Sequence, residues 1–304
     1  MEFADGYIIN PLNFRTGTLY VSPFESNDAH INRQIWSESS ENYDPIVDFE
    51  GKLMSVTESC TKALELVLRD LRLKPDDEVW IVTTSGNKYI SGCVTGTIEM
   101  FCRYSREKTD KTAAILVNHE FGFLYKEINR LIDFGLPIIE DKAYSMYSLF
   151  EDDAGNFAGD YTVFSMAKMF PIQAGGLIYS KKGLVLQDNL PPDAVKYHKA
   201  CFLNYHSKKE YIIRKRNENY NLMTFYFEQF GFSPRFIPER SETPGAFLFN
   251  AQGIDLSGLK TYLQRQGIEC SVFYGEEAFY LPCHQKMNKQ HIEYIITLIR
   301  NFLK

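Results

Sequence analysis

Short apolar segments alternate with amphipathic helical segments through the middle of the chain, and this alternation constrains the fold more than any other feature of the sequence. Short apolar strands separated by helices are typical of a largely parallel sheet whose faces are covered by helices. We therefore expect a large α/β domain over residues 46–190. Its predicted strands are 79–82, 113–117, 137–139, 161–164 and 176–179.

Two helices of this domain show clear apolar periodicity. The first has leucine and valine side chains at helical spacing over residues 64–71, with Ser59 or Thr61 as its cap and Pro75 after its end. The second occupies residues 124–132. Together with the strands, they predict an alternating α/β pattern.

Both ends of the chain follow weaker patterns. Residues 1–45 show no clear periodicity, so we expect an irregular N-terminal segment there. Residues 191–304 predict a linking helix followed by a smaller α+β C-terminal domain, with strands at 246–250 and 268–274 and helices at 256–263 and 288–299. The linking helix carries a basic cluster, which we interpret as a solvated helix face, with phosphate binding as the alternative: Lys208, Lys209, Arg214, Lys215 and Arg216.

The charge balance and the cysteines argue against several classes of protein. Lys and Arg number 33 against 39 Asp and Glu, a net charge of −6, which argues against a nucleic-acid or anionic membrane partner. No apolar run approaches the roughly 18 residues of a membrane span, and the first residues are acidic, so we expect a cytoplasmic protein. The six cysteines have no metal-binding spacing, which predicts reduced thiols and no metal site.

Polar side chains follow the predicted strands at the points where they end. Asn118 and His119 follow the second strand, Glu140 and Asp141 the third, and Lys168 lies four residues after the end of the fourth. Ligands of open parallel sheets bind at the carboxyl ends of the strands, and a helix beginning near residues 59–61 can offer backbone N–H groups to an anion.

An acid, an amine and an anion site together suit pyridoxal 5'-phosphate (PLP). A lysine can bind the aldehyde of this cofactor, a carboxylate can keep its pyridine nitrogen protonated, and a helix end can hold its phosphate. Alternatively, Asp141 and Lys168 form an incidental ion pair or point to solvent. A dinucleotide-binding protein lacks support because no GxGxxG follows a predicted strand. A cysteine hydrolase that uses Cys60 and His119 is a further alternative.

Several motifs carry a resemblance to a known family. The turn 59–64, the segment Pro137–Ala143, the interval from Lys168 to the Gly175-Gly176 pair, and the segment 281–284 are similar to motifs of the DegT/DnrJ/EryC1/StrS sugar aminotransferases. The resemblance extends from about residue 56 to the end of the chain. It implies the PLP-dependent transferase fold of type I, PLP as the cofactor, and a homodimer.

The resemblance also implies a role for each matching residue. Lys168 would bind the cofactor aldehyde and then move a proton as general base and acid. The remaining residues would contact the cofactor: the Cys60 amide and Thr61 at the phosphate, Asp141 at the pyridine nitrogen, Tyr144 near the phenolic oxygen, Tyr89 stacked on the ring, Ser165 at the approach to the lysine, and Asn204 at the phosphate of the neighbouring subunit's site.

The chain also departs from the family pattern. The family has glycine at the position of Cys60 and two more residues between Ser165 and Lys168, and its chains are longer. We expect an aminotransferase with glutamate as amino donor and a nucleotide-linked keto sugar as acceptor. Lys168 argues against the family's dehydratases, which carry histidine instead. The alternative is a degenerate relative that binds a ligand or partner without turnover.

Overall fold

The computed structural model describes residues 3–4, 7–8, 18–150, 157–183 and 185–304. The chain forms two compact units. The sheet unit comprises residues 23–210 and 238–245, and the C-terminal unit comprises residues 1–22, 211–237 and 246–304. None of the helices in the described part of the chain combines the length and apolar character that a membrane span requires.

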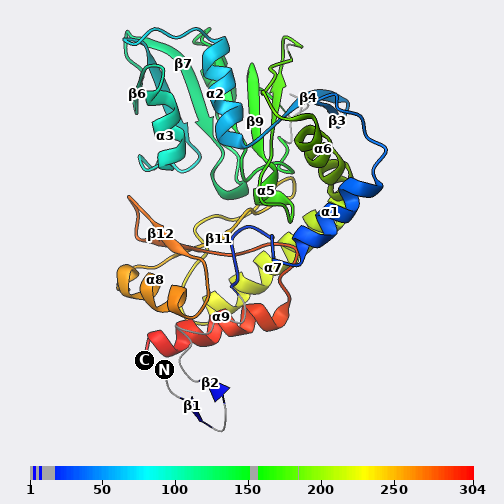
Figure 1. Ribbon diagram of the computed structural model, residues 1–304. Coiled ribbons are helices and arrows are strands. Elements are labelled where there is room, and N and C mark those ends of the chain that lie inside the picture. Colours follow the sequence, from blue (N-terminus) through cyan, green and yellow to red (C-terminus); the bar gives the residue numbers. More distant parts are fainter. Residues whose placement is uncertain (1–2, 5–6, 9–17, 151–156, 184) are drawn as a thin grey trace. The chain divides into compact units, whose positions relative to one another are not determined.

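The sheet unit is built on an eight-stranded sheet with the strand order β3-β4-β10-β9-β8-β7-β5-β6 (Figure 1). Strands β9, β8, β7, β5 and β6 are parallel, whereas β10, β4 and β3 pair in antiparallel fashion. This is the mostly parallel α/β sheet that the sequence predicts. The strands are β3 (Ile46–Phe49), β4 (Lys52–Thr57), β5 (Glu78–Thr83), β6 (Arg103–Ser105), β7 (Thr112–Asn118), β8 (Ile138–Asp141), β9 (Tyr161–Ser165) and β10 (Gly176–Ser180).

Helices cover the sheet because its strands are apolar on both faces. Helices α2 (Cys60–Asp70) and α3 (Gly92–Glu99) pack on one face over Leu116 and Ile139, and Figure 1 shows α2 lying along the strands. Helix α4 (Ile128–Ile132) packs on the opposite face over Ile115 and Ile138. Side chains alternate along a strand, so Asp141 lies on the α2 face with Ile139, and Glu140 lies on the α4 face with Ile138.

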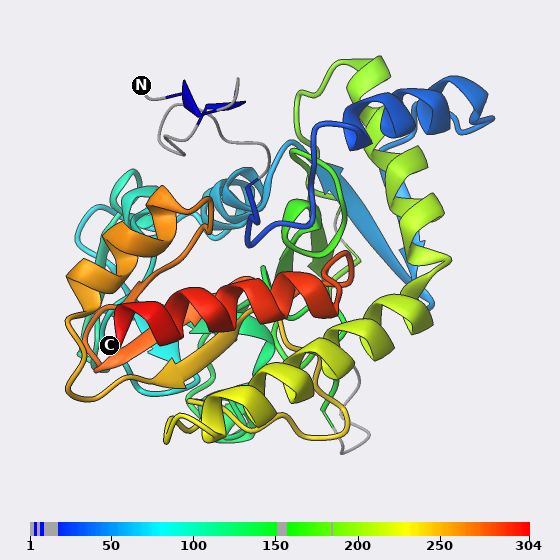
Figure 2. The same cartoon turned by 90° about the horizontal axis from the view of Figure 1, so that it is seen from below.

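The N-terminal segment is more regular than expected. Residues 28–38 form α1 (Asp28–Glu38), which lies beside α6 (Pro192–His206), as Figure 2 shows. The buried side chains of α1 are polar: Asn32 donates to the Pro171 carbonyl at 2.8 Å and accepts from the Tyr205 hydroxyl at 2.6 Å. The prediction of irregular structure is wrong here because this helix buries polar residues and therefore shows no apolar stripe.

The C-terminal unit contains most of α7 (Lys209–Glu228) and a three-stranded antiparallel sheet with the order β11-β13-β12. The central strand β13 is missing from the sequence prediction of strand, helix, strand, helix. Asn288 caps the last helix through the His291 N–H, as predicted. The elements are β1 (Phe3–Ala4), β2 (Tyr7–Ile8), β11 (Phe247–Asn250), α8 (Leu256–Arg265), β12 (Ser271–Phe273), β13 (Ala278–Leu281) and α9 (Lys289–Phe302).

The interpretation of the basic cluster as a solvated helix face is wrong for one of its residues, Arg216. Arg214 and Lys215 are paired with Glu218 on the helix surface, as that interpretation predicts. Arg216 is instead fully buried, and its Nε donates to the Gln285 side chain at 2.9 Å. Its neighbours in sequence include charged surface residues, so the sequence does not show that Arg216 faces the core.

Candidate active site

The ends of three neighbouring strands and the start of α2 meet at one edge of the sheet. Asn118 at the end of β7 is in register with Asp141 at the end of β8, and Asp141 is in register with Val163 of β9. Thr57, the last residue of β4 before α2, pairs with Gly176 of β10. The strand ends that the sequence singles out are therefore brought together by parallel pairing.

Asp141 is buried and held by two hydrogen bonds. The Asn118 amide donates to Oδ2 at 2.9 Å, and the Ala143 N–H donates to Oδ1 at 3.0 Å. Burial raises the pKa of Asp141 above its usual value, although both hydrogen bonds act in the opposite direction. No role toward Asp141 is predicted for Asn118, although parallel pairing of two consecutive predicted strands places their ends side by side.

Lys168 lies in a single helical turn, α5 (Met166–Met169), which begins directly after β9. Its Nζ lies 5.0 Å from the centroid of the Tyr144 ring. The short interval from Ser165 to Lys168 is therefore folded as this single helical turn.

Both Asp141 and Lys168 act electrostatically on the Cys60 thiol. Burial raises the pKa of Cys60 well above its usual value, and the Asp141 carboxylate raises it further. The Lys168 ammonium acts on the same thiol in the opposite direction. Asp141 and Lys168 therefore each lie within electrostatic reach of the first residue of α2.

The start of α2 is fixed by its cap and by the Gly175-Gly176 pair. The Ser59 side chain accepts the Lys62 N–H at 3.1 Å, which leaves the N–H groups of Cys60 and Thr61 at the open end of the helix. A Cβ on Gly176 would come within 2.5 Å of the Ser59 carbonyl carbon. Only glycine lets β10 approach α2 this closely.

The other predicted cofactor contacts lie in three separate elements. Tyr89 is in the loop between β5 and α3, is 46% exposed, and donates its N–H to Asn87. Asn204 is a half-buried residue of α6, and Ser165 directly precedes α5. The roles of these residues and of Tyr144 toward a cofactor remain predictions.

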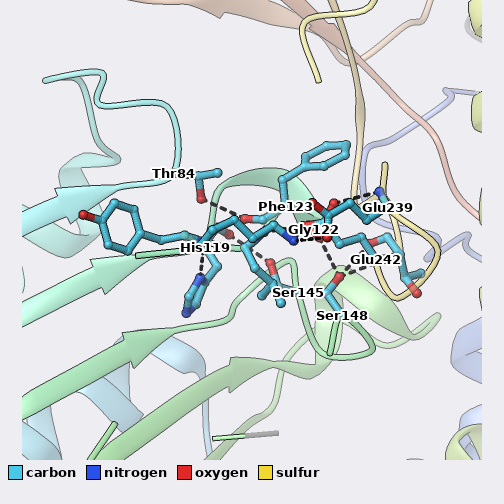
Figure 3. Close-up of polar contacts among 12 residues, drawn as sticks. Thr84, His119, Gly122, Phe123, Ser145, Ser148, Glu239 and Glu242 are labelled. Atoms are coloured by element: carbon cyan, nitrogen blue, oxygen red, sulfur yellow. Dashed lines mark hydrogen bonds and ion pairs between the residues drawn. The ribbon is translucent and has the colours of Figure 1, made fainter. Parts of the chain in front are cut away.

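The α4 face of β8 carries a second group of buried polar side chains. His119 Nδ1 accepts the Tyr125 N–H at 3.0 Å, so its Nε2 carries the proton and donates to Glu140 at 3.0 Å. Glu140 also accepts from the Gly159 N–H at 2.8 Å. Figure 3 shows His119 beside Ser145, whose hydroxyl donates to the His119 carbonyl.

These contacts contradict the cysteine hydrolase alternative. Both ring nitrogens of His119 are committed to other partners, and burial lowers its pKa even though Glu140 acts to raise it. A nucleophilic cysteine needs a lowered pKa, whereas that of Cys60 is raised. Among the described residues, no cluster of His, Cys, Asp and Glu side chains could hold a metal ion.

Comparison with known proteins gives matches in structure but none in sequence. No family model matches the sequence, and no curated protein does. The "putative sugar aminotransferase Spr1654" of Streptococcus pneumoniae, in its apo form, is similar with a TM-score of 0.70 and 16% identity, over 92% of this chain and 96% of that chain.

Two further solved structures have different reactions in their descriptions. A DegT DnrJ EryC1 StrS aminotransferase of Brucella abortus has a TM-score of 0.64 and 14% identity, over 92% and 91% of the chains. The GDP-4-keto-6-deoxy-D-mannose-3-dehydratase of E. coli, with bound hydrated PLP, has 0.67 and 16%, over 93% and 99%. These likenesses confirm the fold predicted from the motifs, that of fold type I transferases.

Proposed function

We propose that the chain is a PLP-dependent aminotransferase of the DegT/DnrJ/EryC1/StrS type, which moves an amino group from glutamate to a nucleotide-linked keto sugar. The observation that carries the proposal is the convergence of Asp141, Lys168 and the start of α2 around the Cys60 thiol. The shared fold with sugar aminotransferases and with a PLP-containing dehydratase supports it.

The residues present fit the cofactor. Asp141 is a buried carboxyl group whose hydrogen-bond donors are the Asn118 amide and the Ala143 N–H. Burial raises its pKa although both hydrogen bonds and His119 act in the opposite direction, so a protonated pyridine nitrogen would provide a counter-charge. The open N–H groups of Cys60 and Thr61 at the α2 terminus suit a phosphate.

When bound, PLP supplies an aldehyde and an electron-withdrawing pyridinium ring. Lys168 binds the cofactor through Nζ and then holds and moves the proton at that atom. Asp141 keeps the ring nitrogen protonated, and Asn118 orients its carboxylate through the 2.9 Å hydrogen bond. A lysine rather than a histidine at position 168 favours amino transfer over the dehydratase reaction.

The proposal is tested by identifying the residue that carries the cofactor. The full chain with PLP is reduced with borohydride, digested and analysed by mass spectrometry. We expect the label on Lys168 and none on Lys142, the fully buried lysine next to Asp141. Lys168→Arg serves as the matched control and should abolish labelling while the fold is retained. Labelling at another lysine contradicts the proposal.

A degenerate relative is the second candidate, and Cys60 is the observation that favours it. A side chain at the position of the family's glycine narrows the approach of the helix terminus to a phosphate. Folded protein that stays colourless and unlabelled with added PLP supports this candidate. If PLP binds, conversion of its absorption band by glutamate, followed by reaction with a nucleotide-linked keto sugar, tests the proposed substrates.

We also propose a homodimer in which Asn204 completes the phosphate site of the neighbouring subunit. Sedimentation should give twice the mass of the 35.2 kDa chain. Mixing inactive Lys168→Ala and Asn204→Ala chains should restore activity, because one site of the mixed dimer then has both residues intact. Failure of complementation between folded dimers contradicts the role of Asn204.

A further inference from the structure

Residues 238–245 form a segment of the sheet unit that follows the other residues of the unit by almost thirty positions in sequence. We call this segment the strap. Its first half is attached through two acidic side chains: Lys126 contacts Glu239 at 2.7 Å and Glu242 at 2.8 Å. The Leu124 N–H also donates to Glu242, at 2.9 Å. Figure 3 shows both glutamates beside the turn that contains Gly122 and Phe123.

The second half of the strap is attached through its backbone. The Thr243 N–H donates to the Ser148 hydroxyl at 2.9 Å, and that hydroxyl contacts the Gly122 carbonyl at 2.5 Å (Figure 3). The Gly245 N–H donates to the Phe121 carbonyl at 2.6 Å. These groups are buried, so the hydrogen bonds hold the strap in one position.

Two glycines make the contact unusually close. Gly122 has a φ of 103°, and a Cβ there would come within 2.3 Å of the Thr243 carbonyl oxygen. A Cβ on Gly245 would come within 2.8 Å of Tyr144 Cδ1 and 2.9 Å of Tyr144 Cβ. The backbone of the strap therefore lies directly against the Tyr144 side chain.

Tyr144 in turn contacts the reactive region. Its ring is 5.4 Å from that of Phe121 and 5.0 Å from Lys168 Nζ, a distance at which a ring face attracts a cation. Movement of the strap at Gly245 would displace this ring, because the two are in van der Waals contact. The strap is thereby mechanically connected to the Lys168 amine.

We propose that the strap positions the Lys168 amine through Tyr144, with Gly245 and Tyr144 as positioning residues. The proposal deepens the proposed function and rests on it for the role of the amine. The ring face attracts the Nζ cation and restricts where Nζ can lie. Cys60, on whose thiol both Asp141 and Lys168 act, lies in α2, and Asp141 lies in β8; the strap variants leave both elements unchanged.

The test measures the reactivity of the Lys168 amine in the full chain after any bound cofactor has been stripped. The protein is labelled with limiting acetic anhydride, and acetylation of Lys168 is compared with that of exposed Lys74 by mass spectrometry. Gly245→Ala should raise the relative rate by about threefold, because a displaced ring attracts and restrains Nζ less. Tyr144→Leu should raise it at least as much. Tyr144→Phe keeps the ring and should leave it unchanged.

Gly96→Ala on α3 is the matched control, because nothing lies within 4 Å of the added Cβ and the rate should not change. A folded Gly245→Ala variant with the wild-type rate overturns the proposal, even if Tyr144→Leu alters it. If Gly245→Ala does not fold, Glu242→Gln decides: it weakens the Lys126 contact and should give a smaller increase, and an unchanged rate overturns the proposal.

The outcome is distinguishable from that of the borohydride experiment. A strap effect on Lys168 with no cofactor labelling would contradict the proposed function and leave the positioning role intact. Labelling at Lys168 with no strap effect would support the proposed function and overturn the positioning role of the strap.

Discussion

Strand β8 has one buried carboxyl group on each face, and the pKa values of these two groups are shifted in opposite directions. On the α4 face, Glu140 accepts from His119, Gly159 and Thr162, and Lys142 acts on it electrostatically. Burial would raise the pKa of Glu140, but these contacts outweigh it and lower the pKa. On the α2 face, Asp141 has two donors and a raised pKa. The fold therefore compensates the charge of Glu140, whereas Asp141 is the carboxyl group that we propose a bound cofactor compensates.

The largest effect should come from removing the compensated acid. Glu140→Ala leaves the Gly159 N–H and the His119 Nε2–H buried without their acceptor and removes the buried charge that offsets the Lys142 ammonium, so we expect the free energy of unfolding to fall by about 3–5 kcal/mol. Urea titration measures the loss. Glu140→Gln keeps an acceptor and should lose less. A fall under about 1 kcal/mol would mean that the α4 face does not depend on this carboxylate.

Lys142 should make a pH-dependent contribution on the same face. Burial lowers its pKa to about 8 despite the opposing effect of Glu140, against 10.5 for an ordinary lysine. Between these values the unfolded chain binds the extra proton, so stability from this group rises with pH and is reduced below pH 8. The difference in unfolding free energy between wild type and Lys142→Met should therefore increase across this window, by roughly 3 kcal/mol at most.

This comparison with Lys142→Met cancels other groups that titrate at high pH, such as the buried cysteines. A flat difference curve would contradict the assignment to Lys142.

The uncompensated acid should behave in the opposite way. A raised folded pKa means that Asp141 favours folding only at acid pH, and this contribution is lost as pH rises through that pKa. Asp141→Asn is neutral throughout, so at pH 7 the cofactor-free protein should melt about 2–4 °C higher. Added PLP should stabilise the wild type but not this variant. A lower melting temperature without PLP would remove the contrast between the two faces.

The smallest effect concerns the thiol at the start of α2. Cys60→Gly removes the side chain that narrows the approach to the helix terminus, and should tighten PLP binding by roughly threefold, about 0.6 kcal/mol. Spectroscopic titration measures the dissociation constant. Cys60→Ala retains the Cβ and should give less than this gain. Weaker binding by Cys60→Gly would show that the thiol itself contributes to the site.

The sequence predicts the apolar parts of this fold well because burial leaves a periodic signal. The strands around Ile81, Leu116 and Val163 and the Ser59-capped helix α2 lie where periodicity and capping place them. Helix α1 and strand β13 were missed. The first buries Asn32 rather than a leucine stripe, and the second has only four residues.

The site is predictable to the extent that it follows strand ends. Asp141 and Lys168 are predicted as site residues in this way, and parallel register explains why Asn118 joins Asp141. The contact of Gly245 with Tyr144 could not be found, because it joins segments about a hundred residues apart and leaves no local pattern. The proton-free Nδ1 of His119 also depends on its contact with the Tyr125 N–H, and the sequence does not show where this N–H lies.

The late position of the strap has a consequence during translation. Ser148 and Thr243, which are joined by a hydrogen bond, are 95 positions apart. Every strand of the large sheet has left the ribosome before Glu242 and Gly245 are synthesised. A nascent chain ending at residue 210 therefore has to leave the Leu124 N–H and the Ser148 hydroxyl without these partners. Completion of the sheet unit awaits the synthesis of residues 238–245, and this unit cannot be released as an uninterrupted fragment.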